Sequence, residues 1–248
     1  MKLQGRMTHQ TSTDAELAFN ALIDNEPARR APVEALQPPL SVAPAPEPHF
    51  AYNFIKRVMD IAGALTLIFF LFIPMIACSI AIKLTSPGPI FFRQRRLGLG
   101  GKVFYCVKFR TMVQDAELRQ TEVDHLNVTN GPTFKHPQDP RITPLGRFLR
   151  RTSLDELPQV WNIFTGDMSM VGPRSLPVAQ NCYQPGQEVR LSVKPGLTCI
   201  WQVSGRSTIG FERWMELDAE YVRTRSVRKD IALILRTVPA VLSGNGAM

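Results

Sequence analysis

Two acidic residues, Asp155 and Glu156, are adjacent in the segment RRTSLDELPQVWN (residues 150–162). Neighbouring carboxylates repel each other, so their surroundings must offset this repulsion. The arginines just upstream and the positive end of a helix would both do so. An ionised aspartate among arginines can hold Mg²⁺ or attack phosphorus. The pair is therefore the candidate catalytic centre of the chain, and both acids are candidate Mg²⁺ ligands.

Two local structures are compatible with this segment. Ser153 and Glu156 have the spacing of a helix capping box, which would explain Glu156 but not Asp155. That helix would place Pro158 in its second turn, where the missing N–H loses a bond to Leu154. Pro158 fits better as the first residue of a helix. We therefore expect both acids at the N-terminus of a helix that starts at Pro158.

A β-hairpin is predicted upstream, in PIFFRQRRLGLGGKVFYCVKFRTM (residues 89–112). Residues 90–95 and 103–110 are strand-like, and the glycines between them favour a turn. A nucleotide-binding glycine loop would need a helix after the glycines, and none is predicted there. Strand alternation places Lys108 and Arg110 on one face. From Lys83 to Arg110 there are seven Lys or Arg and no acid, a patch that suits anionic lipid headgroups, a phosphate group, or both.

Residues 61–82 are 22 residues without a charge, bracketed by Lys56, Arg57 and Lys83. About 20 apolar residues span a bilayer as a helix, whereas a soluble domain of this size would have to enclose such a helix completely. Pro74 removes one backbone hydrogen bond and kinks the helix. The helix either spans the membrane or enters and leaves through one leaflet, and basic residues on both flanks do not choose between these alternatives.

The remaining segments differ in charge and composition. The chain has 248 residues and a formal net charge of +8, and a basic body of this kind suits phosphate, nucleic acid or anionic lipid. Residues 1–49 are rich in proline and are predicted to form a disordered leader without a signal peptide, with a short helix over residues 13–24. The four cysteines form no CxxC and the four histidines are scattered, so we predict neither disulfides nor a Cys or His metal site, and a reducing setting.

Helices are predicted on both sides of the acid pair. A turn near residue 139 leads into a short helix that ends near Arg150. The stretches GDMSMVGPRSLP and KPGLTCIWQVSGR are predicted to be rich in loops, and they contain Arg174 and Arg206. The tail over residues 211–242 is predicted to be largely helical, with a pattern that suits a membrane surface or a solvated basic face.

Several of these stretches resemble the bacterial sugar transferase family, the monotopic phosphoglycosyl transferases. They are KRVMDI, SPGPIFFRQRRLGLGGKVFYCVKFRTM, DPRITPLGRFLRRTSLDELPQVWNIFTGDMSMVGPR and KPGLTCIWQVSGR. The resemblance runs from Lys56 to the C-terminus, and it is greatest to members that initiate exopolysaccharide synthesis. It implies that the chain transfers a sugar-1-phosphate from a UDP-sugar to undecaprenyl phosphate and releases UMP, the first step of a glycan.

The resemblance also implies roles for single residues. The family's acid pair falls on Asp155 and Glu156: the aspartate attacks the sugar-bearing phosphorus, and the lipid phosphate then attacks this phosphosugar-enzyme. Mg²⁺ at the pair, aided mainly by Glu156, would neutralise the diphosphate. The family's substrate arginines fall on Arg150 and Arg174. Two phosphate-bearing substrates in one site need positive charge from several elements, so the candidate phosphate-binding residues are Lys108, Arg110, Arg150, Arg174 and Arg206.

Residues and resemblance together predict an α/β fold, mostly α with a β-hairpin, in a membrane-anchored monotopic enzyme. Its membrane elements would be one kinked re-entrant helix and amphipathic interfacial helices. The expected parts are the leader (1–49), the membrane helix (50–85) and a catalytic domain (86–248) on the cytoplasmic face of the inner membrane. The sequence departs from the family at Ile73, Ser175 and Cys199, where the family commonly has serine, proline and glycine. Without a serine at position 73, no hydroxyl beside Pro74 can satisfy the freed backbone group, and this reopens the possibility that the helix spans the membrane.

The expected partners are a UDP-sugar, undecaprenyl phosphate and membrane lipids, but not nucleic acid, and a homo-oligomer is left open. Two other functions remain as alternatives: a non-catalytic, membrane-anchored organiser of polysaccharide export, and a nucleic-acid-binding membrane protein. The acid pair argues against the first. Only charge favours the second, because the basic clusters lack stacking aromatic residues. Galactose and glucose are favoured over N-acetylated sugars.

Overall fold

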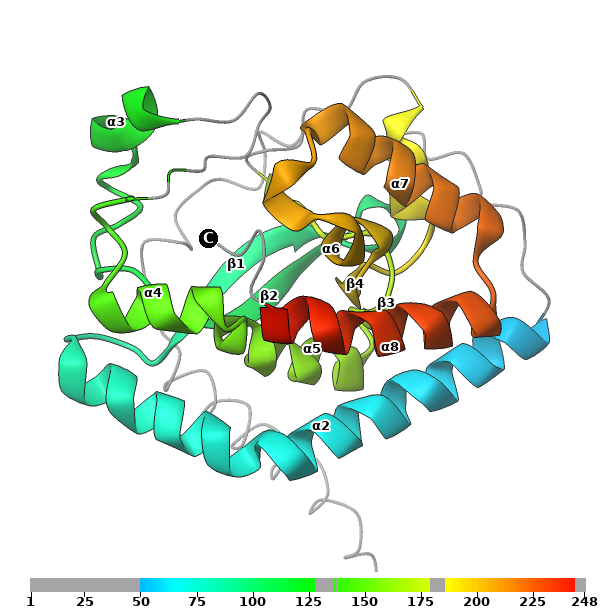
Figure 1. Ribbon diagram of the computed structural model, residues 1–248, viewed down its shortest axis with the longest axis horizontal. Helices are drawn as coiled ribbons and strands as arrows, with labels where there is room; N and C mark the ends of the chain where they lie inside the picture. Colours follow the sequence, from blue (N-terminus) through cyan, green and yellow to red (C-terminus); the bar gives the residue numbers. More distant parts are fainter. Residues whose placement is uncertain (1–49, 128–135, 137, 179–185, 244–248) are drawn as a thin grey trace, which may run out of the picture.

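The computed structural model describes residues 50–127, 136, 138–178 and 186–243. The predicted leader and its short helix lie outside these residues. Most of the described chain is helical, with two small sheets (Figure 1). In chain order, with η for 3-10 helices, the elements are α2 (Phe50–Thr85), β1 (Phe91–Leu97), η3 (Leu99–Gly101), β2 (Val103–Phe109), α3 (Gln120–Val123), η4 (Asp124–Leu126), α4 (Pro144–Arg151), η5 (Leu154–Gln159), α5 (Val160–Thr165), β3 (Ser169–Val171), η7 (Gln187–Ser192), β4 (Gly196–Thr198), α6 (Ile200–Ser204), η8 (Arg206–Thr208), α7 (Phe211–Thr224) and α8 (Val227–Ser243).

The long helix α2 lies along one side of the molecule, with the other described elements on one side of it (Figure 1). It has 36 residues, and within the described ranges it is the one helix long and apolar enough to cross a membrane. It bends along its length and contains Pro74, which cannot donate to the Phe70 carbonyl. The nearby Ser79 hydroxyl donates to Met75 O at 2.8 Å and so does not replace that bond. The prediction of one long apolar helix is confirmed.

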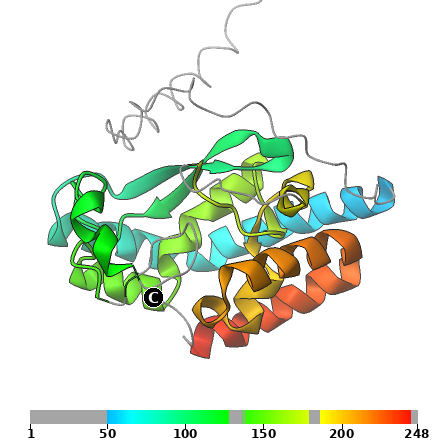
Figure 2. The ribbon, with the colours of Figure 1, turned by 90° about the horizontal axis from the view of Figure 1, so that it is seen from above.

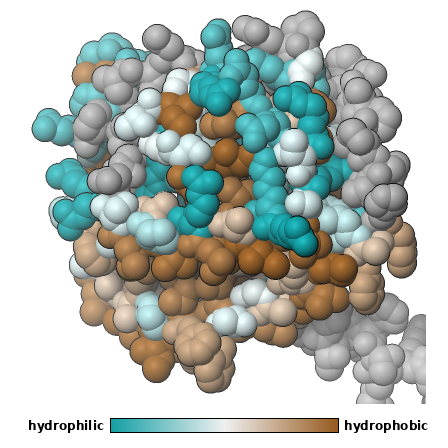
Figure 3. All heavy atoms as spheres, turned by 45° about the vertical axis from the view of Figure 1, so that its right-hand side comes forward, coloured by the Kyte–Doolittle hydropathy of each residue, from teal (hydrophilic) through white to brown (hydrophobic). Residues whose placement is uncertain are grey.

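A continuous apolar surface covers this side of the molecule, below a hydrophilic upper part (Figure 3). Soluble proteins rarely expose apolar patches of this extent, so it indicates association with a membrane. We call it the apolar face. Its exposed residues include Phe54, Phe69, Phe70, Phe72, Ile73 and Leu84 on α2, Trp161 and Phe164 on α5, and Ile231, Leu235, Val238 and Leu242 on α8.

The predicted hairpin is formed by β1 and β2, which pair antiparallel from Phe91 opposite Phe109 to Leu97 opposite Val103. The turn between them contains Gly100 and Gly101, both with positive φ (65° and 75°) that glycine adopts without strain. The hairpin lies on the side of the body opposite α8 (Figure 2). The sequence therefore predicted both the strands and the turn correctly.

The second sheet was not predicted. Its strands β3 and β4 have three residues each and pair in parallel, with Ser169 opposite Gly196 and Val171 opposite Thr198. The sequence predicted loops here, because such short strands show no alternation and pair with a segment far along the chain. A Cβ on Gly196 would lie only 2.0 Å from the Gly172 nitrogen, so the pairing depends on glycine. This close approach fixes the loop that follows β3.

The helical segment around the acid pair differs from both predicted forms. It begins at Leu154 as η5 and continues as α5, so the prediction of a start at Pro158 is wrong. The capping box is wrong as well, since Ser153 makes no side-chain capping bond. Residue i bonds to i−3 in a 3-10 helix, so Pro158 removes only the bond to the Asp155 carbonyl. Both acids still lie in the first turn of a helical segment, as expected.

The short helix before the acid pair and the helical tail are confirmed as helices. The short helix α4 begins after Thr143, whose hydroxyl accepts a hydrogen bond from Gly146 N at 2.9 Å. The tail forms two helices, α7 and α8, with a break between Thr224 and Val227. The main core lies between β2, α5, β3, α6, α7 and α8, and a smaller cluster of Ile82, Phe109 and Leu149 joins the end of α2 to β2 and α4.

A partly buried polar cluster docks the first part of α2 on the body. Lys56 Nζ and Tyr52 OH donate to Asp230 Oδ2 at 2.9 and 3.0 Å, and Tyr221 OH donates to Asp230 Oδ1 at 2.8 Å. Asp230 is 1% exposed. We call Tyr52, Lys56, Tyr221 and Asp230 the anchor cluster. It joins α2 to α7 and α8.

A second polar contact follows one turn later in α2. Asp60 is buried, and its Oδ1 accepts hydrogen bonds from Ser169 Oγ and Met170 N, both at 2.8 Å. At the other end of the apolar run, Ile82 is buried in the smaller core cluster. Both ends of this run therefore contact the same body.

Candidate functional site

Two cations hold Glu156 in place. Lys108 Nζ donates to Glu156 Oε1 at 2.8 Å, and Arg174 donates to both carboxylate oxygens, with a distance of 3.1 Å from Nη1 to Oε2. The side chains of Lys108, Glu156 and Arg174 are 15%, 13% and 18% exposed. They come from β2, from η5 and from the loop after β3. Three of the predicted site residues are thus brought into direct contact.

Asp155 is buried beside them, but its bonding differs. Within the described ranges its carboxylate makes no hydrogen bond or ion pair, although Lys108, Arg150 and Arg174 lie within electrostatic range. Buried polar groups normally have a hydrogen-bond partner. The Asp155 oxygens therefore remain available to a substrate or a metal ion.

The surroundings shift the pKa values of the two acids in opposite directions. Burial raises the pKa of Asp155, and Lys108 opposes this rise. Burial acts in the same way on Glu156, but Arg174 and Lys108 outweigh it and hold the pKa of Glu156 well below its usual range. Two neighbouring acids with opposite shifts are typical of sites in which each has its own task.

Two further predicted cations lie close to the pair without a hydrogen bond to it. Arg150 is in the last turn of α4, and its Nε donates to Thr111 Oγ1 at 2.9 Å. Burial lowers the pKa of Arg150, and Asp155 acts in the opposite direction. Burial also lowers the pKa of Arg206, and there Glu156 acts in the opposite direction. Both guanidinium groups are thus influenced by the charges of the acid pair.

The fifth predicted cation, Arg110, is directed elsewhere. It is buried, and its Nη2 donates to Ser86 O at 2.8 Å and to Ser86 Oγ at 2.7 Å. These bonds tie the end of β2 to the segment after α2. The structure does not bring Arg110 into contact with the acid pair, and its role in phosphate binding stays a prediction.

Backbone strain is concentrated at this site. Among the described residues, the non-glycine residues with positive φ are Ser153 (59°) and Arg206 (53°). The first immediately precedes η5, and the second is a predicted phosphate ligand. A left-handed residue with a Cβ costs roughly 1–2 kcal/mol. Such strain persists where the surrounding structure enforces it, which is often at functional sites.

A metal ion would find two oxygen ligands here. Within the described ranges no group of three or more His, Cys, Asp or Glu side chains gathers to bind a metal. Asp155 and Glu156 are adjacent carboxylates, and Mg²⁺ is commonly held by one or two carboxylates, with water and substrate phosphate completing its shell. The donor set fits Mg²⁺ in that mode.

Asn162 is a supporting residue that the sequence analysis missed. Its Oδ1 accepts from Val107 N at 3.0 Å, and its Nδ2 donates to Tyr105 O at 2.8 Å. The side chain pairs with β2 as a neighbouring strand would. It ties the strand that carries Lys108 to the helix after the acid pair. A polar residue inside an apolar helical segment was the available signal.

Arg96 was predicted to belong to a surface patch, but it is buried. Its Nη1 donates to Ser175 O at 2.7 Å and to Ser175 Oγ at 3.3 Å. Ser175 is one of the departures from the family, and its hydroxyl supplies one of these acceptors. The basic patch is therefore smaller than predicted, because Arg96 and Arg110 are used inside the fold.

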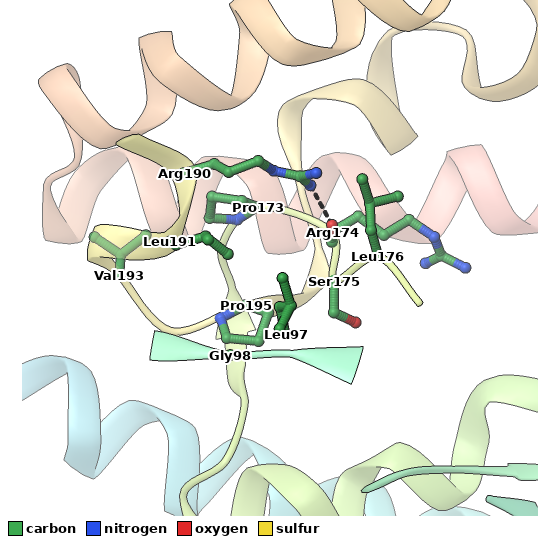
Figure 4. Close-up of a pocket in the computed structure, with 10 residues that line it drawn as sticks. All are labelled: Leu97, Gly98, Pro173, Arg174, Ser175, Leu176, Arg190, Leu191, Val193 and Pro195. Atoms are coloured by element: carbon green, nitrogen blue, oxygen red, sulfur yellow. Dashed lines mark hydrogen bonds between the residues drawn. The ribbon is translucent and has the colours of Figure 1, made fainter. Parts of the chain in front are cut away.

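Arg190 and Asp218 form a second missed group. They make a 2.7 Å ion pair with side chains 2% and 1% exposed. Arg190 Nη2 also donates to the carbonyl of Arg174, beside a small pocket between β1 and the loops around it (Figure 4). The signal for Asp218 was its position on the apolar face of α7, three and four residues from Tyr221 and Trp214.

Comparison with known proteins gives one family match and several relatives. Residues 51–244 match the family described as "Bacterial sugar transferase". The chain is 40% identical over 206 residues to the galactosyl transferase CpsE of Streptococcus agalactiae, covering 80% of this chain and 44% of the relative. It is 39% identical over 212 residues to the UDP-glucose:undecaprenyl-phosphate glucose-1-phosphate transferase of Caulobacter vibrioides, covering 82% and 75%.

A third relative is the exopolysaccharide production protein ExoY of Rhizobium meliloti, 36% identical over 200 residues, with 77% of this chain and 87% of the relative covered. The chain spans less than half the length of CpsE. The family match nevertheless covers most of the chain, including the hairpin, the acid pair and α8. The chain therefore belongs to the bacterial sugar transferase family.

Proposed function

We propose that the chain transfers a hexose-1-phosphate from a UDP-sugar to undecaprenyl phosphate, releases UMP, and so initiates a glycan. One observation carries the proposal: two adjacent acids with opposite pKa shifts, of which Glu156 is partly buried and bonded by Lys108 and Arg174, and Asp155 is buried and free of hydrogen bonds within the described residues. Asp155, which has no hydrogen-bond partner among the described residues, can attack phosphorus, while Glu156, bonded by two cations, stays ionised. The names of the relatives support the reaction class and favour galactose or glucose as the sugar.

In the first step, an Asp155 carboxylate oxygen attacks the phosphorus that bears the sugar. The bond from that phosphorus to the bridging diphosphate oxygen breaks, and UMP leaves with the electron pair. In the second step, a phosphate oxygen of the lipid attacks the same phosphorus. The bond to Asp155 breaks and restores the carboxylate. Each step is a displacement at phosphorus, so the protein contributes position and charge.

The basic residues supply this charge. Lys108 and Arg174 would turn part of their bonding from Glu156 to the phosphate oxygens, and Arg150 and Arg206 are within electrostatic range of the acids. Arginine suits phosphate because its planar fork can donate two parallel bonds. Arg110 would bind phosphate only if it gave up its hydrogen bonds to Ser86.

Glu156 and Asp155 would hold Mg²⁺, with Glu156 as the main ligand. When bound, the metal would neutralise charge on the diphosphate. Glu156 is suited to this because the pKa of its carboxyl lies well below the usual range, so it stays ionised. Lys108 and Arg174 would then orient Glu156 from either side, as groups around metal ligands commonly do.

The membrane element would be re-entrant. Both ends of the apolar run contact the same body, through Asp60 at the start and Ile82 at the end. A run that crossed the bilayer would carry its two ends to opposite sides, roughly 30 Å apart. Docking at both ends supports a helix that lies in one leaflet, with residues 86–248 as the catalytic domain. Nucleotide sugars are made in the cytoplasm, so that domain would face the cytoplasmic side of the inner membrane.

The experiment that tests the reaction is UMP release from a panel of UDP-sugars, with undecaprenyl phosphate, Mg²⁺ and the full chain in nanodiscs. We expect release with UDP-galactose or UDP-glucose. Intact-mass analysis after UDP-sugar alone should show a phosphosugar adduct on the wild type and none on Asp155→Asn. No release with any sugar would instead favour the non-catalytic organiser of polysaccharide export.

The re-entrant arrangement has its own test. A single cysteine near Ser12, in a background without the native cysteines, is treated with a membrane-impermeant maleimide in cells with a permeabilised outer membrane. A re-entrant α2 leaves this cysteine on the cytoplasmic side, so we expect labelling only after lysis. Labelling before lysis would mean that α2 spans the membrane.

A further inference from the structure

Arg174 is supported from behind by a group that lies outside the acid pair. Arg190 comes from η7, and its Nη2 donates to the main-chain carbonyl of Arg174 (Figure 4). The Arg174 side chain runs away from this contact, and its guanidinium binds Glu156. The residue is thus held at both ends, at its carbonyl by Arg190 and at its guanidinium by Glu156.

Asp218 fixes Arg190 in turn. The two side chains form an ion pair at 2.7 Å, and both are almost fully buried. Arg190 Nη1 also contacts the sulfur of Met215 at 3.7 Å. A buried ion pair is a weak stabiliser of a fold, because desolvation offsets the attraction between the charges. The pair matters here because it fixes Arg190, which donates to the Arg174 carbonyl.

Two stacked tryptophans complete the support. The rings of Trp201 and Trp214 lie 4.5 Å apart with an angle of 17° between their planes. The Arg174 guanidinium lies 6.0 Å from the Trp201 ring centre, and the Arg190 guanidinium lies 5.6 Å from that of Trp214. Each arginine therefore packs over one ring of a rigid aromatic pair, at a distance where cations attract the ring face.

We propose that Arg190 and Asp218 are positioning residues that aim the Arg174 guanidinium at the diphosphate of the substrate. This inference rests on the proposed function. Arg190 acts through the backbone of Arg174, whose carbonyl it bonds. A misplacement of about 1 Å at a phosphate-binding group can lower a rate about 100-fold. Asp218 keeps Arg190 in the one orientation that reaches the carbonyl.

A double-mutant cycle tests this, using Asp218→Asn and Arg174→Ala alone and together. Two readouts are taken: kcat and KM for UMP release, and the Kd for UDP by calorimetry. We expect Asp218→Asn alone to raise KM and Kd about tenfold, within the range of coupling between contacting residues. In the Arg174→Ala background it should change neither, because no guanidinium remains to be aimed.

The matched control is Asp139→Asn, which breaks a buried 2.8 Å ion pair with Arg141 in the turn before α4. Its effect on KM and Kd should be the same with and without Arg174. Arg190→Lys provides a second variant if Asp218→Asn does not fold. Arg190 Nη2 makes both the ion pair with Asp218 and the bond to the Arg174 carbonyl. Lysine keeps the charge beside Asp218, but its ammonium ends one bond short of this position and should not reach the carbonyl, so the same loss of UDP affinity should appear at a nearly unchanged thermal midpoint.

Equal losses in both backgrounds, or unchanged UDP affinity in Arg190→Lys, would overturn the positioning role and leave Asp218 as a core residue only. If the UDP affinities of the variants show this coupling but the wild type releases no UMP, the proposed reaction is overturned instead. The two failures are therefore distinguishable.

Discussion

The anchor cluster and the acid pair both bury carboxylates beside basic side chains, but their charge balance differs. In the anchor cluster one acid, Asp230, faces one cation, Lys56, at 2.9 Å. At the acid pair two carboxylates lie within electrostatic range of five cations, Arg96, Lys108, Arg150, Arg174 and Arg206. The four residues of the anchor cluster are together neutral, whereas the acid pair and its cations carry a surplus of positive charge.

The hydrogen bonds differ in the same way. Both oxygens of Asp230 accept bonds, from Tyr52, Lys56 and Tyr221. Asp155 accepts none within the described residues, although it is buried. A saturated, neutral cluster has no capacity left for a ligand, and its effect is on stability. A cluster with surplus positive charge and a free carboxylate favours an anionic ligand with a reactive centre.

The largest expected effect is on activity at Asp155. Asp155→Asn should lower UMP release by about 10²–10⁴-fold, because an amide cannot act as the anionic nucleophile. Burial raises the pKa of Asp155, which means that the fold disfavours its charge. The thermal midpoint of the variant should therefore stay the same or rise. The measurements are single-turnover UMP release and a melting curve in detergent.

Glu156→Gln serves as the comparison variant. Glu156 is bonded by two cations, so this change should lower both activity and the thermal midpoint. If Asp155→Asn kept nearly the wild-type rate, Asp155 would not be the nucleophile. The contrast between a free acid and a bonded one would then carry no functional meaning.

The next effect concerns the surplus charge. Arg174→Ala should raise KM and lower kcat/KM for the UDP-sugar by roughly 10–150-fold, the equivalent of about 1.5–3 kcal/mol for charged hydrogen bonds. Arg213→Ala is the matched control, because Arg213 is 62% exposed and pairs with Glu216 on the surface of α7. Its kcat/KM should match that of the wild type. Equal kinetics in both variants would reduce the basic residues to membrane contacts.

The sequence alone identified the parts of the molecule that follow a short-range pattern. The apolar run, the hairpin with its glycine turn and the adjacent acids are all readable from neighbouring residues. Resemblance to the family supplied the substrate roles of Arg150 and Arg174, and no local pattern could join Arg174 to the acids. What failed were local details at the acid pair, where Ser153 is left-handed and Pro158 lies inside a 3-10 helix.

The long-range supports could not be predicted, because each depends on residues far apart in the chain. Arg96 looked like part of a basic surface, yet it bonds the carbonyl of Ser175 in the core. The pairing of β3 with β4 depends on the close approach of Gly172 and Gly196. Arg190 and Asp218 gained meaning only when the fold placed them behind Arg174.

A third prediction tests the structural side of the comparison. Asp230→Ala leaves the charge of Lys56 without its acid, which should lower the free energy of unfolding by about 3–5 kcal/mol. At about 2–4 °C per kcal/mol, the thermal midpoint should fall by roughly 10 °C. Activity per folded molecule should persist, since the anchor cluster has no surplus charge for substrate.

Glu216→Ala is the control for this variant, because it breaks an exposed ion pair, with side chains 62% and 64% exposed. Surface pairs contribute little, so its melting curve should match the wild type. Loss of activity at temperatures where Asp230→Ala is fully folded would contradict the separation between anchor and site.

The smallest effect concerns Asp218, which lies between the two regions. Burial raises the pKa of Asp218 to about 6, with Arg190 opposing, from an ordinary value of 3.8. The folded protein thus binds this proton more tightly than the unfolded chain does. Its contribution to stability is complete below pH 3.8 and is lost as the pH rises to about 6. Two pH units correspond to at most about 3 kcal/mol.

Asp218→Asn removes this dependence, so the stability advantage of the wild type over the variant should shrink as the pH rises from about 4 to about 6, and then stay constant. Melting curves across this range measure it.

Asp139→Asn is the control, and its stability difference from the wild type should change with pH in the opposite direction. Bonds from Arg141 outweigh burial and lower the pKa of Asp139. The wild-type advantage there should be lost as the pH falls below about 3.9. A wild-type advantage over Asp218→Asn that grew with pH would mean that Arg190 outweighs burial, and that Asp218 belongs with the saturated acids of the anchor cluster.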